Sequence, residues 1–306
     1  MRAFAIVMMI QGHTIQSLLD VSYQNSDSYI YHTWLFLRAF TAPLFIFVSG
    51  FIFTFLLFQS EFNIKKNPRI IKGIWRGVSL ILIGYLLRYP TIKVFNLASI
   101  SYSQWLTFFT VDALHLIGLG LLLIVLFSFI SSKIKLNAIV SFSVLTIALF
   151  ITSPFINSIV WNSSANIFFT SYITSQFGSQ FPLFPYLIFI FLGAIFGSLL
   201  SQKKDYLSGA KNLFVTMLAG AFVITVSYLV TTEYSNTLLR IGVVIVLLSV
   251  FGFISKNIKL LPRVIESFAR NSLWLYIIHL IIIYGSQCPL VYFKLWVKPY
   301  PQKFQL

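Results

Sequence analysis

Long apolar segments alternate with short polar or basic segments along almost the whole chain. In lipid, every backbone N–H and C=O group needs a partner inside the protein, so an apolar segment that crosses a bilayer is expected to be a helix. The pattern therefore predicts an all-α fold, a polytopic transmembrane helix bundle of about nine spans that forms a single domain over residues 1–306. The expected spans, each long enough or nearly long enough to cross, lie at about residues 3–19, 35–58, 74–89, 111–131, 137–157, 183–201, 211–231, 237–255 and 270–287.

Composition supports the same class of protein. Hydrophobic residues make up 58% of the chain and charged residues only 9%, whereas a soluble domain carries about 25% charged residues. The net charge of +15 would suggest nucleic acid as a partner in a soluble protein. Here the basic residues lie in short loops between apolar segments, where they orient the chain and meet lipid headgroups. We therefore expect membrane lipids as partners and no nucleic acid. A single cysteine excludes a thiolate metal cluster, and no metal is expected.

The basic residues also predict the orientation of the chain. The loops at 20–33 and 156–182 contain no Lys or Arg. By the positive-inside rule these two loops face outside and the N-terminus is cytoplasmic. The largest group of basic residues, which is expected on the cytoplasmic side, lies in the 59–76 loop and comprises Lys65, Lys66, Arg69, Lys72 and Arg76.

Histidines are the first candidates for chemistry, because imidazole transfers protons near neutral pH. His13, His115 and His279 fall inside or beside apolar segments, where an ionisable group is rare and usually faces a polar interior. His13 follows Arg2 by eleven residues, a helical rise of about 16 Å, so it lies near mid-membrane if Arg2 lies at the surface. The polar neighbours Gln11 and Thr14 predict a polar cavity at that depth. The alternative for any one of these histidines is a structural imidazole, hydrogen-bonded between helices.

Other polar residues are open to more than one interpretation. His32 precedes the second span and belongs either to a site or to an aromatic girdle at the interface. Asp112 and His115 are three residues apart on one helix face, so the carboxylate either orients the imidazole or simply neutralises it. Arg38, inside the second span, is a cation that needs a carboxylate, a phosphate or helix carbonyls as partners.

Two classes of function fit these residues. The chain has no P-loop, GxGxxG, HExxH or GxSxG motif. Intramembrane ionisable residues also mark transport pathways, so a transporter or flippase of a small polar or lipid-linked substrate is the alternative to an enzyme. Transporters often consist of two related halves with interrupted helices, and the sequence shows no such symmetry.

Several stretches resemble known membrane acyltransferases. The opening RAFAIVMMIQGH resembles the Arg-x10-His signature of the acyltransferase 3 family. More of the chain, over roughly residues 2–285, resembles a related group, the bacterial proteins with a heparan-α-glucosaminide N-acetyltransferase-like catalytic domain. The stretches that carry this resemblance, in the order of that group, are PLFIFVSG (Pro43 to Gly50), WRGVSLILIGYLL (Trp75 to Leu87), LHLIGLGLLL (Leu114 to Leu123), FPLFPYLIFIFLGAIFG (Phe181 to Gly197) and NSLWLYIIH (Asn271 to His279).

The resemblance implies acyl transfer in a bacterial inner (cytoplasmic) membrane. The donor is cytosolic acyl-CoA, expected to be acetyl-CoA, which is a co-substrate rather than a permanently bound cofactor. The acceptor is a sugar or glycan at or across the membrane. Expected partners are therefore acyl-CoA, a carbohydrate acceptor and lipids, with a homo-oligomer left open.

The resemblance leaves two candidates for the catalytic base. In acyltransferase 3 proteins it is the His of Arg-x10-His, which matches His13. In the lysosomal N-acetyltransferase it is a His just before the second span in a His-x-x-Trp setting, which His32 resembles with one residue fewer before Trp34. Acyl transfer also needs donors for the developing oxyanion and cations for the coenzyme A phosphates. The residues expected to bind the substrate or acyl-CoA are Arg2, Arg38, Lys65, Lys66, Arg69, Asp112, His115 and His279.

Overall fold

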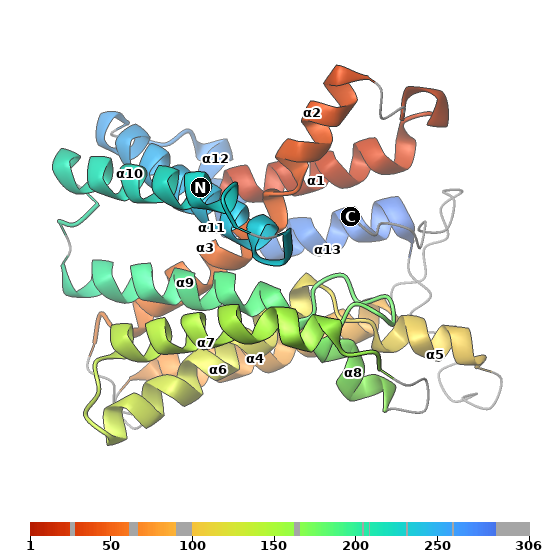
Figure 1. Cartoon of the computed structure of the whole chain (residues 1–306), viewed down its shortest axis with the longest axis horizontal. Helices are drawn as coiled ribbons and strands as arrows, with labels where there is room; N and C mark the ends of the chain where they lie inside the picture. The colour runs from red at the N-terminus through yellow and green to blue at the C-terminus, as the bar shows by residue number, and fades with distance from the viewer. Residues whose placement is uncertain are drawn as a thin grey trace.

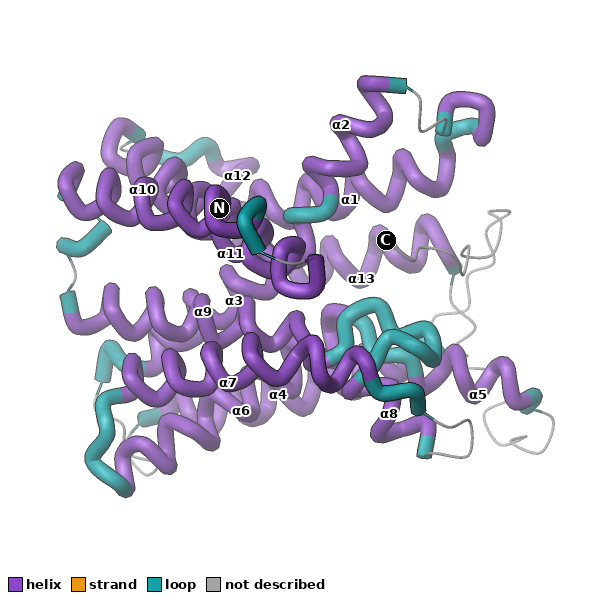
Figure 2. The backbone as a smooth tube through the Cα atoms, in the orientation of Figure 1, coloured by secondary structure: helices purple, strands orange, loops and turns teal. Residues whose placement is uncertain are grey.

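The computed structural model describes residues 1–24, 28–60, 67–89, 100–161, 166–203, 205–207, 209–230, 232–258 and 260–285. Within these residues the chain is helical and contains no strand, which confirms the predicted fold class (Figures 1 and 2). The helices are α1 (Arg2–Leu18), the 3-10 turn η1 (Val21–Tyr23), α2 (Tyr29–Arg38), α3 (Thr41–Leu57), α4 (Pro68–Leu87), α5 (Tyr102–Phe109), α6 (Ala113–Lys133), α7 (Ala138–Ser158), α8 (Ile167–Ile173), α9 (Leu183–Gln202), α10 (Ala210–Ser227), α11 (Thr232–Asn257), α12 (Arg263–Arg270) and α13 (Ser272–Tyr284).

The expected count of about nine spans is not confirmed. Among the described residues, seven helices are long and apolar enough to cross a membrane, or eight if α12 and α13 together form one bent span. The expected first span, α1, has 17 residues and rises only about 26 Å, against a hydrocarbon core of about 30 Å. The expected ninth span, at about residues 270–287, corresponds to α13, which has only 13 residues and follows α12 after a bend of 77° at Asn271.

The helices α3 and α9 form the centre of the bundle and pack with their backbones in direct contact. A Cβ atom added at Gly193 of α9 would lie 2.1 Å from the carbonyl oxygen of Phe47, and one added at Gly50 of α3 would lie 2.2 Å from that of Ile190. Small residues permit this approach, and close packing is a main source of helix association in lipid. The pair α4 and α6 meets in the same way through Gly77 and Gly118.

The remaining helices pack around this centre in two groups. In Figures 1 and 2, α4, α6 and α7 lie on one side of α9, while α1, α2 and α13 lie on the other. Helix α1 packs against α3, α12 and α13, and α10 pairs with α11. The first and last described helices of the chain are therefore neighbours, and α3 contacts α1.

The glycine contact predicts a specific weakness of the fold. Because the Cβ of an alanine at position 193 would meet a backbone carbonyl rather than a flexible side chain, α3 and α9 must move apart. We expect Gly193→Ala to lower the free energy of unfolding by about 1–3 kcal/mol or more. The measurement is thermal unfolding of the purified protein in detergent. Gly209→Ala is the control, because its Cβ would lie 3.3 Å from the movable amide of Asn212, and an equal loss in both variants would contradict the prediction.

Candidate active site

Four polar side chains gather where α1, the end of α2 and α13 meet. His13 comes from α1, Arg38 is the last residue of α2, and His279 and Tyr284 come from α13. The helix contacts of α1 with α2 and α13 bring them together. Sequence analysis named the first three of these residues separately and missed Tyr284, because a tyrosine in an apolar segment carries no sequence signal of its own.

His13 is held by two aromatic rings of α13. Its Nδ1 atom lies 2.9 Å from the hydroxyl oxygen of Tyr284, in a hydrogen bond between residues 271 positions apart. The Tyr284 ring meets the imidazole edge-on at a centroid distance of 5.7 Å, and the His279 ring lies 5.4 Å away at a tilt of 41°. His13 itself is only partly buried. Its imidazole is therefore fixed on one side and accessible on another.

His279 has one defined tautomer. Its Nδ1 atom lies 3.0 Å from the carbonyl oxygen of Leu275. A carbonyl oxygen only accepts hydrogen bonds, so Nδ1 carries the proton and Nε2 carries the lone pair. This Nε2 atom is buried and has no hydrogen-bond partner among the described residues. Since buried polar atoms are nearly always paired, the atom marks a position where a donor group of another molecule can bind.

Arg38 brings a positive charge next to His13. Its guanidinium donates to the side-chain oxygen of Gln16 and lies 5.4 Å from the centre of the Trp34 ring. Its side chain passes over Gly12, where an added Cβ would lie 3.1 Å from Arg38 Nε. Gly12 thus makes room for the arginine one residue before His13, and the positive charge of Arg38 acts electrostatically on the imidazole.

His32, the other candidate for the catalytic base, has a different environment. It lies on α2 and is exposed. Its backbone N–H donates to the carbonyl oxygen of Ser28 at 2.9 Å. The structure therefore places His13 in a polar cluster and His32 on an open helix face, and the catalytic role of either stays a prediction.

Asp112 and His115 meet as expected, in a cluster at the start of α6. Asp112 caps the helix by accepting from the backbone N–H groups of Leu114 and His115, and its Oδ1 lies 2.9 Å from His115 Nδ1. Its Oδ2 lies 3.3 Å from Arg88 Nε at the end of α4. Burial alone would raise the pKa of Asp112, but His115 and Arg88 lower it below its usual range, so the carboxylate stays ionised. These contacts support a structural role for Asp112, and the predicted binding role of Asp112 and His115 stays a prediction.

The expected cationic residues are placed only in part. Arg2 begins α1, is partly buried, and has Arg76 of α4 as its charged neighbour. Arg69 is exposed in the first turn of α4. Lys65 and Lys66 lie outside the described residues.

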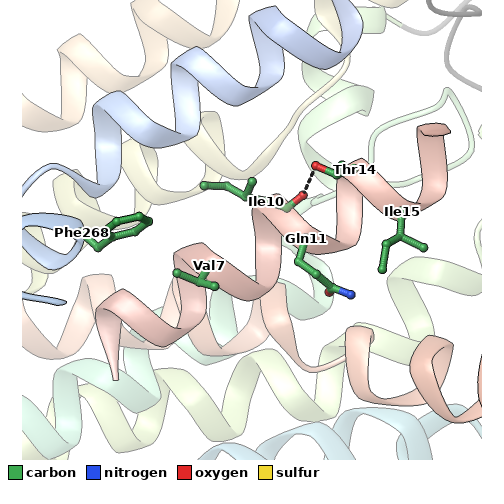
Figure 3. Close-up of a pocket in the computed structure, with 6 residues that line it drawn as sticks. All are labelled: Val7, Ile10, Gln11, Thr14, Ile15 and Phe268. Atoms are coloured by element: carbon green, nitrogen blue, oxygen red, sulfur yellow. Dashed lines mark hydrogen bonds between the residues drawn. The ribbon is translucent and has the colours of Figure 1, made fainter. Parts of the chain in front are cut away.

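The cavity beside Gln11 is mainly apolar in the structure, whereas the sequence predicted a polar one. A pocket of about 260 Å³ does border this part of α1 (Figure 3), but its lining is mainly apolar. Thr14 turns its hydroxyl to the backbone oxygen of Ile10 at 2.8 Å, and the side-chain oxygen of Gln11 is buried without a partner among the described residues. The pocket is lined by Val7, Ile10, Gln11, Thr14, Ile15 and Phe268, and His13 is not part of it.

Comparison with known proteins adds one finding. The sequence model of the acyltransferase 3 family, described as an acyltransferase domain, matches residues 1–302. No curated protein and no solved structure matches the chain.

A variant in the Asp112 cluster can show whether this cluster stabilises the fold or binds the substrate. Arg88→Gln leaves the buried carboxylate of Asp112 without its cation, so we expect the free energy of unfolding to fall by about 1–3 kcal/mol, less than for a fully buried pair because Arg88 is partly exposed. Thermal unfolding measures the loss, with Arg69→Gln as an exposed control. A variant that unfolds normally but binds its substrate more weakly would instead place this cluster in a binding site.

Proposed function

The chain belongs to the acyltransferase 3 family, and on that premise we propose that it transfers an acyl group from cytosolic acyl-CoA to a sugar or glycan acceptor at or across the membrane. Acetyl is the proposed group, and the bacterial inner membrane with a cytoplasmic N-terminus is the proposed location. The finer resemblance to heparan-α-glucosaminide N-acetyltransferase-like proteins is part of this proposal. It rests on the sequence stretches of α3, α4, α6, α9 and α13.

One observation carries the proposal, the position of His13 in the polar cluster of α1 and α13. The neutral imidazole accepts the proton of the acceptor hydroxyl or amine while the acceptor atom attacks the thioester carbonyl. The tetrahedral intermediate then collapses, the carbon–sulfur bond breaks, and the imidazolium returns the proton to the coenzyme A thiolate. The guanidinium of Arg38, which lies beside His13, supplies positive charge for the oxyanion that develops in between.

The proposed site for the acyl-CoA phosphates lies at the start of α1 and on α4. Arg2 and its neighbour Arg76 place two positive charges together, and like charges side by side favour an anion between them. Arg2 lies about 16 Å from His13 along the helix. An elongated donor such as acyl-CoA can therefore bind with its phosphates near Arg2 and its thioester near His13. The proposal adds Lys65, Lys66 and Arg69 as further partners of the phosphates.

The role of His13 has a direct test in radiolabelled acetyl transfer by purified protein in membranes that contain the acceptor. We expect His13→Gln and His13→Ala to lower kcat at least about 100-fold, the usual size of a general-base contribution, because neither side chain accepts the proton. Both should insert and unfold like the wild type. His32→Gln is the matched control and should keep its activity.

Two results would change the proposal. Near-native turnover in His13→Gln with loss of turnover in His32→Gln would assign the base to His32. Movement of a labelled substrate across the membrane by the wild type, with no label joined covalently to an acceptor, would favour the transporter or flippase.

The donor site predicts a change in KM alone. Replacing Lys65, Lys66 and Arg69 together by Gln removes three charges far from the acyl carbon, so we expect a higher KM for acetyl-CoA and a nearly unchanged kcat. Steady-state kinetics with varied acetyl-CoA measure both constants. Lys211→Gln, an exposed change in the first turn of α10, is the control. An unchanged KM would leave the three residues as signals for orientation only.

A further inference from the structure

We propose that Tyr284 is the positioning residue of His13, with its phenol oxygen accepting the Nδ1–H group and leaving the lone pair of His13 on Nε2. The inference rests on the proposed acyl transfer, because it assigns a tautomer to the base of that reaction. A base needs a lone pair on the nitrogen that faces the substrate, and in known acyl-transfer sites a third group holds the imidazole in that form.

The contact that carries the inference is well defined. The Tyr284 hydroxyl lies 2.9 Å from His13 Nδ1, and the two rings pack edge-on at a centroid distance of 5.7 Å. Tyr284 is the last residue of α13, and Gly285 ends the helix directly after it with a φ of 71°. A positive φ is easy for glycine, so the sharp end is built into the sequence. The hydroxyl therefore belongs to the last turn of a helix that packs against α1.

The direction of the hydrogen bond decides the chemistry. A neutral imidazole has one N–H group and one lone pair. When Nδ1 donates to the phenol oxygen, Nε2 is free to take a proton. When the phenol donates to Nδ1 instead, Nε2 carries hydrogen and cannot act as a base. His279 shows the first arrangement, because its Nδ1 donates to Leu275 and its Nε2 keeps the lone pair.

The other tyrosine of α13 has a packing role. Tyr276 is 4% exposed and stacks on Phe45 at a centroid distance of 6.1 Å. Its ring also supports His279 edge-on at 5.4 Å. Tyr276 thus holds the second histidine from behind, whereas the hydroxyl of Tyr284 contacts His13 itself.

The experiment removes one oxygen atom. Tyr284→Phe keeps the ring and its edge contact with His13, so we expect the folded protein to remain stable. Loss of a single orienting hydrogen bond should lower kcat for acetyl transfer about 10-fold and leave the KM for acetyl-CoA unchanged. Tyr228→Phe, at the exposed end of α10, is the matched control and should behave like the wild type.

A double variant distinguishes a positioning role of Tyr284 from a purely structural one. In a His13→Gln background, Tyr284→Phe should cause no further loss of the residual activity, because residues that act as one unit are not additive. A structural role would lower the activity equally in both backgrounds.

The possible outcomes distinguish the inference from the function on which it rests. An unchanged or raised kcat in Tyr284→Phe would overturn the inference, as would a fall in kcat accompanied by a lower unfolding temperature. A wild-type protein that transfers no acetyl group would overturn the proposed function itself.

Discussion

Direct contact between helix backbones is the constraint on which this structure depends. In lipid, the apolar side chains of two helices gain little by leaving their surroundings, so helices associate through close packing and polar contacts. The glycines of α3 and α9 allow that approach at the centre, and Gly77 with Gly118 repeats it for α4 and α6. The central pair then supports α1, which packs on α3 and carries His13. The position of the candidate base is therefore set by the same packing that holds the bundle together.

The bundle contains two polar clusters with different characters. In the first, Asp112 has an arginine, a histidine and two backbone N–H groups as partners. These contacts satisfy the Asp112 carboxylate and join α4 to α6, while the Nε2 atom of His115 is buried without a partner among the described residues. In the second, His13 is only partly buried and the Nε2 atom of His279 has no partner among the described residues. An unsatisfied polar atom costs free energy, so the unpaired Nε2 of His279 beside the partly buried His13 favours a site for a ligand.

The proposed base on α1 agrees with the orientation that the loop charges predict. The basic start of α4 and Arg2 lie toward one end of the proposed donor path, and His13 lies about 16 Å along α1 from Arg2. A donor and an acceptor that approach from opposite sides of the membrane can meet at such a depth. Membership of the acyltransferase 3 family supports the reaction class, while donor and acceptor belong to the proposal.

Sequence alone determined the helices and several of the polar residues, because a backbone in lipid has few alternatives to a helix and because ionisable residues are conspicuous in apolar segments. It predicted His13 as a candidate and the meeting of Asp112 with His115, which are one helical turn apart. It did not predict the bend at Asn271 between α12 and α13, or that Gln11 lines an apolar pocket that does not include His13. Nor did it connect His13 with Tyr284 or Asp112 with Arg88, since these partners lie on different helices. Only the packing of α1 against α13 and of α4 against α6 decided those contacts, because helix periodicity relates neighbours within a helix and says nothing about which helices meet.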